Sequence, residues 1–193
     1  MEKRISNPAC VITALLLAVV VISIGACSGT ETPEVQAMRI KVKQMEDLQT
    51  TIEKNLATFD TLDFTVFSNQ EWTRLHESHS KDIKVYWPDG HMTQGIDVHI
   101  ADLSAMFVYA PDTRIKVHPI SFGSGNMSAV TGVFEGTFTK PMPIVGGKFI
   151  PPTGKAFSMP MCTIGIWGPD GTMTEEHLFW DNQTYMKQIG LAK

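Results

Sequence analysis

The order of its segments constrains the fold of this chain most strongly, because helical patterns come first and long β-rich runs follow. Apolar residues recur at three- and four-residue steps in the early stretches, whereas the later runs are separated by hairpin-like turns. Helices followed by a meander of long antiparallel strands predict an α+β fold, in which the sheet curls around the helices and leaves a pocket at its open end. The expected helices cover 34–59, a stretch from Ser68 and 95–107; a short strand covers 82–87, and the β-rich runs span 114–122, 127–138, 156–167 and 172–180.

The first 26 residues have the pattern of an export signal. Lys3 and Arg4 precede a run of apolar residues from 10 to 24, and small residues then lead to Cys27. This end resembles the bacterial lipobox, which implies cleavage before Cys27 and lipid attachment to it. We therefore expect a signal peptide over 1–26, a lipidated cysteine and tether over 27–33, and a single domain over 34–193. The implied location is the bacterial envelope, facing the periplasm, with the outer membrane favoured.

Charge and cysteine content exclude two classes of protein. The net charge is −4 and no basic cluster is present, so nucleic-acid binding is not expected. Cys10 lies in the expected signal peptide and Cys27 is expected to carry lipid, so Cys162 is the one cysteine left in the domain and no disulfide within the domain is expected. Its hydrophobic core must stabilise it unaided.

Four short motifs in one order carry a family resemblance. They are APDTRI at 110–115, the strand at 132–137, PTGK at 152–155 and the closing segment at 171–190, which ends in QIG. Together they resemble the SnoaL-like polyketide cyclases over about 72–193. The resemblance implies the cone-shaped fold of the nuclear transport factor 2-like superfamily, with the curled antiparallel sheet packed on N-terminal helices.

The resemblance also implies an active site. In the cyclases an aspartate of the closing strand moves a proton during an aldol ring closure, and by motif position it corresponds to Asp181. No metal or organic cofactor is implied. Strand alternation places Glu175, His177, Phe179 and Asp181 on one side, and Glu176 on the other, without saying which side is inside. The resemblance implies that the side with Glu175, His177 and Asp181 lines the cavity.

The remaining histidines divide into two groups. His76 and His79 are one helical turn apart, but no metal is expected there because no accompanying acidic motif exists. His79 is predicted to contact a ligand, since the family often has a pocket residue near the end of this helix. His91 and His99 are expected to be surface or hydrogen-bonded histidines.

Methionines and aromatic residues are predicted to form the apolar wall of the pocket. Methionine adapts its shape to a ligand, and the mature chain is rich in it. The alternative is that these side chains simply fill the core. The predicted wall residues are Met106, Phe122, Trp167 and Phe179.

Three functions remain open from the sequence. The first is a membrane-tethered, cofactor-free enzyme that moves a proton on a hydrophobic carbonyl compound in a cyclisation or isomerisation, with Asp181 as acid and base. The second is a non-catalytic envelope lipoprotein that binds a small hydrophobic ligand. The third is a module that forms a homodimer. The expected partners are thus a small hydrophobic molecule, the membrane and a second copy.

Overall fold

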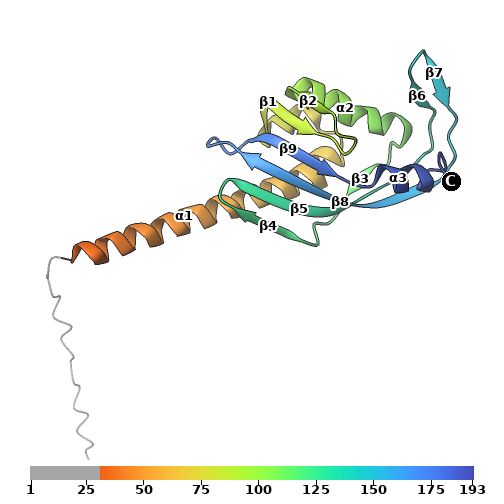
Figure 1. Ribbon diagram of the computed structural model, residues 1–193. Coiled ribbons are helices and arrows are strands. Elements are labelled where there is room, and N and C mark those ends of the chain that lie inside the picture. The colour runs from red at the N-terminus through yellow and green to blue at the C-terminus, as the bar shows by residue number, and fades with distance from the viewer. Residues whose placement is uncertain (1–30) are drawn as a thin grey trace, which may run out of the picture.

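The computed structural model describes residues 31–193 (Figure 1). Signal and lipidation predictions for residues up to Cys27 lie outside these residues. Within them, no helix is both long and apolar enough to cross a bilayer. In chain order the elements are α1 (Pro33–Thr61), η1 (Leu62–Phe67), η2 (Trp72–Glu77), β1 (His79–Tyr86), β2 (Met92–Gln94), α2 (Ile96–Tyr109), β3 (Arg114–Ile115), β4 (Ser121–Ser124), β5 (Met127–Thr137), β6 (Met142–Ile144), β7 (Lys148–Ile150), β8 (Ala156–Trp167), β9 (Met173–Phe179) and α3 (Asn182–Gln188).

Seven strands form one curled sheet in the order β2-β1-β9-β8-β5-β3, with β4 also paired to β5. The longest pairing joins β5 to β8 over eleven positions, from Met127 opposite Ile166 to Thr137 opposite Ala156. All pairs in this sheet are antiparallel except β1 with β9. The α+β prediction is confirmed, and the parallel pair makes the sheet mixed instead of purely antiparallel.

The core lies between the concave face of the sheet and the helical elements α1, η1 and α2 (Figure 1). Residues alternate strictly along β8, with every second side chain buried, because successive side chains of a strand point to opposite faces. At the centre, Phe59 of α1 is fully buried and packs edge-on against Trp167 of β8, with 5.5 Å between ring centroids.

Strand β9 contains a bulge that changes which residues face the core. Ile166 of β8 lies opposite Glu175, but the next residue, Trp167, lies opposite Met173, so Thr174 is an extra residue. A bulge of this kind breaks the period-two alternation of a strand. As a result Met173 and Glu176 are both buried, although they lie three positions apart.

Several segments differ from expectation. The helix expected from Ser68 is the short 3-10 helix η2, and the run expected at 114–122 divides into β3 and β4. The loop predicted between 140 and 152 forms a small hairpin of β6 and β7, which stands away from the sheet in Figure 1. The chain after β9 forms the short helix α3, which the sequence patterns did not indicate.

Helix α1 is much longer than its packed part. Its buried residues are Ile52, Asn55 and Phe59, all in the second half. The first half projects away from the sheet into solvent in Figure 1.

Candidate functional site

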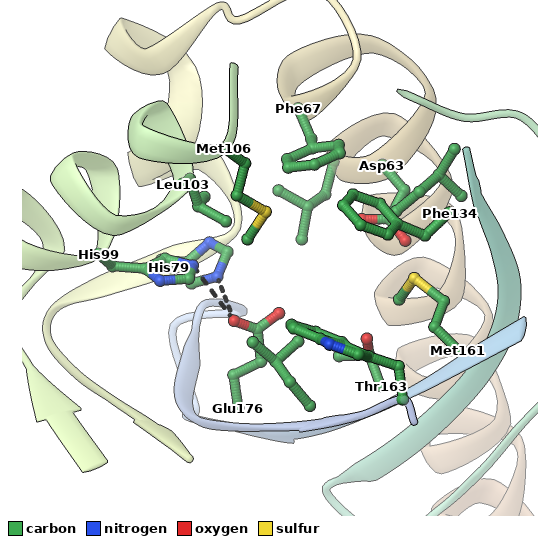
Figure 2. Close-up of a pocket in the computed structure, with 14 residues that line it drawn as sticks. Asp63, Phe67, His79, His99, Leu103, Met106, Phe134, Met161, Thr163 and Glu176 are labelled. Atoms are coloured by element: carbon green, nitrogen blue, oxygen red, sulfur yellow. Dashed lines mark ion pairs between the residues drawn. The ribbon is translucent and has the colours of Figure 1, made fainter. Parts of the chain in front are cut away.

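A small buried cavity lies between η1, α2 and the concave face of the sheet (Figure 2). Its volume is about 40 Å³, which is room for about three water molecules. Most of its wall is apolar, and its ionisable groups come from four different elements. The lining residues are Leu62, Asp63, Phe67, His79, His99, Leu103, Met106, Ile115, Phe134, Met161, Thr163, Glu176, Leu178 and Trp180.

His79 begins β1, and its ring is completely buried. Ser78 Oγ donates to the Leu75 carbonyl oxygen at 3.1 Å and lies 2.8 Å from His79 Nδ1. Because the hydroxyl proton is committed to Leu75, we assign His79 Nδ1 as the donor to Ser78. His79 Nε2 then carries a bare lone pair, and it has no hydrogen-bond partner among the described residues.

Glu176 of β9 faces two histidines. Its Oε2 lies 3.6 Å from His79 Nε2 and 3.2 Å from Nε2 of His99, which comes from α2. Figure 2 marks both pairs with dashed lines. Burial by itself raises the pKa of Glu176, but the two histidines outweigh it and the pKa is well below its ordinary value. Glu176 is therefore held ionised although it is only 4% exposed.

Asp63 occupies the opposite side of the cavity (Figure 2). It comes from η1, a wider turn of the π type that continues α1, and such turns occur often at functional sites. Asp63 Oδ2 lies 2.8 Å from His118 Nε2, and the other ring nitrogen of His118 lies 2.7 Å from Asp60 Oδ1. Burial raises the pKa of Asp63 despite the contact with His118. The two buried carboxyl groups of the cavity therefore have pKa values shifted in opposite directions.

The geometry of Glu176 and the two histidines attracts a positive charge. A bare imidazole lone pair facing a carboxylate is unfavourable in a buried place unless a cation lies between them. A proton meets this need. The donor atoms of His79, His99 and Glu176 also lie within 4.8 Å of one another, which suits a divalent metal ion.

Comparisons with known proteins are consistent with this architecture. The model of the SnoaL-like polyketide cyclase family matches residues 57–189, which is more than half of the chain. The chain belongs to the SnoaL-like polyketide cyclase family. The comparison with curated proteins gave no match.

Solved structures of SnoaL-like proteins share the fold. A protein of Jannaschia sp. CCS1, described as a SnoaL-like polyketide cyclase, is 20% identical with a TM-score of 0.62, covering 74% of this chain and 95% of its own. IdmH of Streptomyces antibioticus, described as a polyketide cyclase, is 21% identical with a TM-score of 0.59, covering 70% and 98%. A Catenulispora acidiphila protein with a ketosteroid isomerase-like fold is 12% identical with a TM-score of 0.55, covering 71% and 92%.

The position of Asp181 corrects the expectation drawn from the SnoaL-like motif. Asp181 is exposed and is the N-cap of α3, where its carboxylate accepts hydrogen bonds from the backbone of Gln183 and Thr184. These hydrogen bonds and one from the Thr184 hydroxyl lower its pKa. Asp181 borders a shallow depression on the outer face of the sheet and does not line the buried cavity. Although several residues of this depression are apolar, the Asp181 carboxylate is exposed to solvent and lacks the burial expected of the general base.

Glu175 and His177 also lie on the outer face. Glu175 Oε1 is 3.4 Å from Lys84 Nζ, and the half-buried ring of His177 stacks on Tyr86 with 4.3 Å between centroids. The expectation that this side of the strand lines the cavity is wrong, because after the bulge at Thr174 it is Glu176 and Leu178 that point inward.

The predicted wall residues divide between the two faces. Met106 and His79 both line the cavity. Trp167 is buried but donates from Nε1 to Ser128 Oγ at 2.6 Å and belongs to the core behind the cavity. Phe122 and Phe179 are exposed and lie outside it.

Three ionisable side chains of the cavity were not predicted from the sequence. His99, expected to be a surface or hydrogen-bonded histidine, is buried in the cavity, and its Nδ1 has no hydrogen-bond partner among the described residues. Glu176 was placed on the outer face, and Asp63 was not considered. One signal was available in the spacing of these acids from buried apolar residues. Asp63 lies four residues after Phe59, on the same side of a helix, and Glu176 lies two residues before Leu178, on the same side of a strand.

Proposed function

We propose that this SnoaL-like domain is a proton-transfer enzyme that acts on a small carbonyl compound in the buried cavity. The supporting observation is the pair of buried carboxyl groups, Glu176 and Asp63, whose surroundings shift their pKa values in opposite directions. Such a separation identifies a base and an acid in sites that move protons near neutral pH. The proposal keeps the reaction type expected from the sequence and moves it from Asp181 to the other face of the sheet.

The base is the facing pair of atoms His79 Nε2 and Glu176 Oε2. Both atoms lack a hydrogen-bond partner among the described residues and are 3.6 Å apart. A proton taken from the carbon next to a carbonyl group would enter this gap and satisfy both atoms. The resulting imidazolium is stabilised by the carboxylate, while Ser78 holds the ring in place.

The acid is Asp63, on the other side of the cavity. Because its pKa is raised, a larger share of Asp63 is protonated than of an exposed aspartate. The protonated carboxyl group can donate a hydrogen bond to the enolate oxygen as negative charge develops on that oxygen. In a cyclisation the enolate carbon would then attack a second carbonyl group of the same molecule. The enolate would become a carbonyl group again while Asp63 keeps its proton, and the alkoxide formed by the attack would take the proton from the His79 imidazolium. In an isomerisation the proton would return at another carbon.

The size of the cavity limits the substrate. About 40 Å³ is far below the roughly 300–1,000 Å³ of drug-sized ligand sites. Two lining residues, Met106 and Met161, have flexible side chains that can move aside without disturbing the backbone. We therefore infer a small, flat substrate that enters as these methionines change rotamer.

Hydrogen–deuterium exchange at carbon tests the proposal without knowledge of the natural substrate. Small β-dicarbonyl compounds and cyclic enones are incubated with the protein in D₂O, and exchange next to the carbonyl group is followed by NMR. Glu176→Gln should slow catalysed exchange about 100-fold or more. Glu175→Gln is the matched control, because its side chain is adjacent in sequence but faces outward. Equal rates in the wild type and Glu176→Gln would refute the assignment.

Two further outcomes have defined meanings. Loss of exchange on chelation, with recovery on adding a divalent metal, would assign the positive charge between Glu176 and the histidines to a metal ion instead of a proton. Retention of a co-purified hydrophobic molecule, with no exchange for any compound tested, would favour the non-catalytic binding protein.

The cellular setting is part of the proposal. We infer that the chain is tethered to the bacterial envelope by lipid on Cys27, which follows a signal-like segment of 26 residues. Cell fractionation tests this. Cys27→Ser should move the protein out of the membrane fraction and remove the lipid mass from its N-terminal peptide, whereas Cys162→Ser should change neither.

A further inference from the structure

The first half of α1 presents an apolar stripe with no cover. Val35, Met38, Val42 and Met45 are between 43% and 71% exposed, although they lie on one side of a regular helix. Scattered apolar residues on a surface are ordinary, but a continuous stripe along a projecting helix indicates an interaction surface. Among residues 31–193, Figure 1 shows no other element beside this half of the helix.

The spacing of the stripe is that of a heptad repeat. Steps of three and four residues alternate from residue 35 to residue 59, so that positions a and d fall at Val35, Met38, Val42, Met45, Gln49, Ile52, Leu56 and Phe59. Apolar residues occupy every one of these positions except Gln49. A sustained repeat of seven, with period 3.5, is the pattern of a two-stranded coiled coil. From Ile52 onward the stripe is used inside the domain.

The flanking charges specify how a second helix would lie. In a parallel pair, position g of one helix meets position e of the next heptad in its partner. Here Glu34 at g would meet Arg39 at e, and Lys41 at g would meet Glu46 at e. Both contacts are attractive, and two-fold symmetry provides each of them twice. The alternative antiparallel alignment centred on the same stripe would bring Lys41 against Lys41.

We propose that the exposed half of α1 forms a parallel two-stranded coiled coil with a second copy of this chain. Its seam consists of Val35, Met38, Val42 and Met45, closed by a pair of Gln49 side chains. A polar residue at one a position fixes the register at some loss of stability. Leu48, at position g, would extend the buried surface next to the seam. Ile40 lies on the outer face and stays exposed.

The occupant is a second copy because the helix is complementary to itself. The same surface offers both the apolar seam and the matching charges, as a two-fold interface requires. A parallel pair also places both N-termini at one end and both domains at the other. With only about two heptads in the seam, the dimer should be weak in dilute solution and strengthened where two chains are held close together.

Cysteine cross-linking tests the alignment. In the full chain with Cys10, Cys27 and Cys162 changed to serine, Met38→Cys and Met45→Cys should each give a disulfide-linked dimer under mild oxidation, because equal d positions face each other. Asp47→Cys, on the outer face of the same helix, is the matched control. Linking no faster than this control would overturn the coiled coil. Preferential linking of Met38→Cys to Met45→Cys in a mixture would overturn the parallel alignment.

Charge reversal tests the partner. Lys41→Glu and Glu46→Lys alone should each raise the dissociation constant of the dimer about tenfold, because two attractive pairs become repulsive. The double variant should restore the wild-type value. Sedimentation velocity over a range of concentrations measures all four proteins. A dimer insensitive to both reversals forms through another surface, and monomers that bind lipid vesicles through this helix assign the stripe to the membrane; either result overturns the proposal.

Discussion

Replacement of Glu176 by glutamine should destabilise the domain at neutral pH while leaving its shape unchanged. The carboxylate is buried, and its pKa is well below its ordinary value because His79 and His99 outweigh the effect of burial. Glutamine resembles the neutral form of the side chain, which these surroundings disfavour. Removal of one partner from a buried charged pair lowers the free energy of unfolding by about 3–5 kcal/mol.

The size of the effect can be measured by thermal and urea unfolding. A loss of about 3 kcal/mol in a domain of this size corresponds to a fall of about 10 °C in Tm. Glu175→Gln is the matched control and should shift Tm by no more than about 1–2 °C, since its pair with Lys84 is partly solvent-exposed.

The pH dependence of the same experiment distinguishes charge from packing. A lowered pKa in the folded state gives stability that is present above the ordinary glutamate pKa of about 4.5 and is lost as the pH falls below it. The wild type should therefore approach the stability of Glu176→Gln as the pH is lowered from 6 to 3. An unchanged difference between the two proteins across this range would refute the electrostatic reasoning, and so would a more stable variant at pH 7.

Three further predictions concern other parts of the fold. Asp181→Ala should lower the free energy of unfolding by about 1 kcal/mol through loss of the N-cap of α3, while Asp181→Asn, which keeps a capping side chain, should change carbon-acid exchange by less than twofold. Gly165→Ala should lower the free energy of unfolding, measured in urea, by about 1–3 kcal/mol, because the new methyl carbon would lie 2.5 Å from Met173 Sδ in the buried core. An unchanged free energy of unfolding would contradict this and would mean that the Met173 side chain moves aside without loss of stability. His118 has a raised pKa, since its contacts with Asp63 and Asp60 outweigh burial, so its contribution to stability is complete below about pH 6.5 and is lost as the pH rises above it; His118→Gln should abolish this decline in a pH series of urea unfolding curves.

Local sequence patterns were sufficient for most of the elements. The run 156–167 was predicted as a strand and is β8, and the helix predicted at 34–59 is α1, from Pro33 to Thr61. The alternation of β8 is strong because one whole face of the strand is buried, and the apolar stripe of α1 is strong because the second half of that helix packs on the domain. Helix α3 was missed since it is seven residues long and none of its residues is buried, so it has no apolar stripe to detect.

The candidate site could not be obtained in the same way. Period-two alternation correctly separated Glu175 from Glu176, but it could not say which of them faced inward. The bulge at Thr174 decides this, because an extra residue shifts all later side chains relative to Met173. Asp63, His79, His99 and Glu176 come from four elements spread over more than 110 positions of the sequence, and only the packing of these elements brings them to one cavity.

The sequence by itself determined the class of fold, the ordered family motifs and the heptad stripe of α1, since each depends on neighbours within a few residues or on the order of segments. Tertiary structure alone decided which face of β9 is inside, which histidines meet a carboxylate and how little space remains between them. Those features depend on contacts between distant segments in a close-packed interior, where a single inserted residue or methionine rotamer changes what a cavity contains.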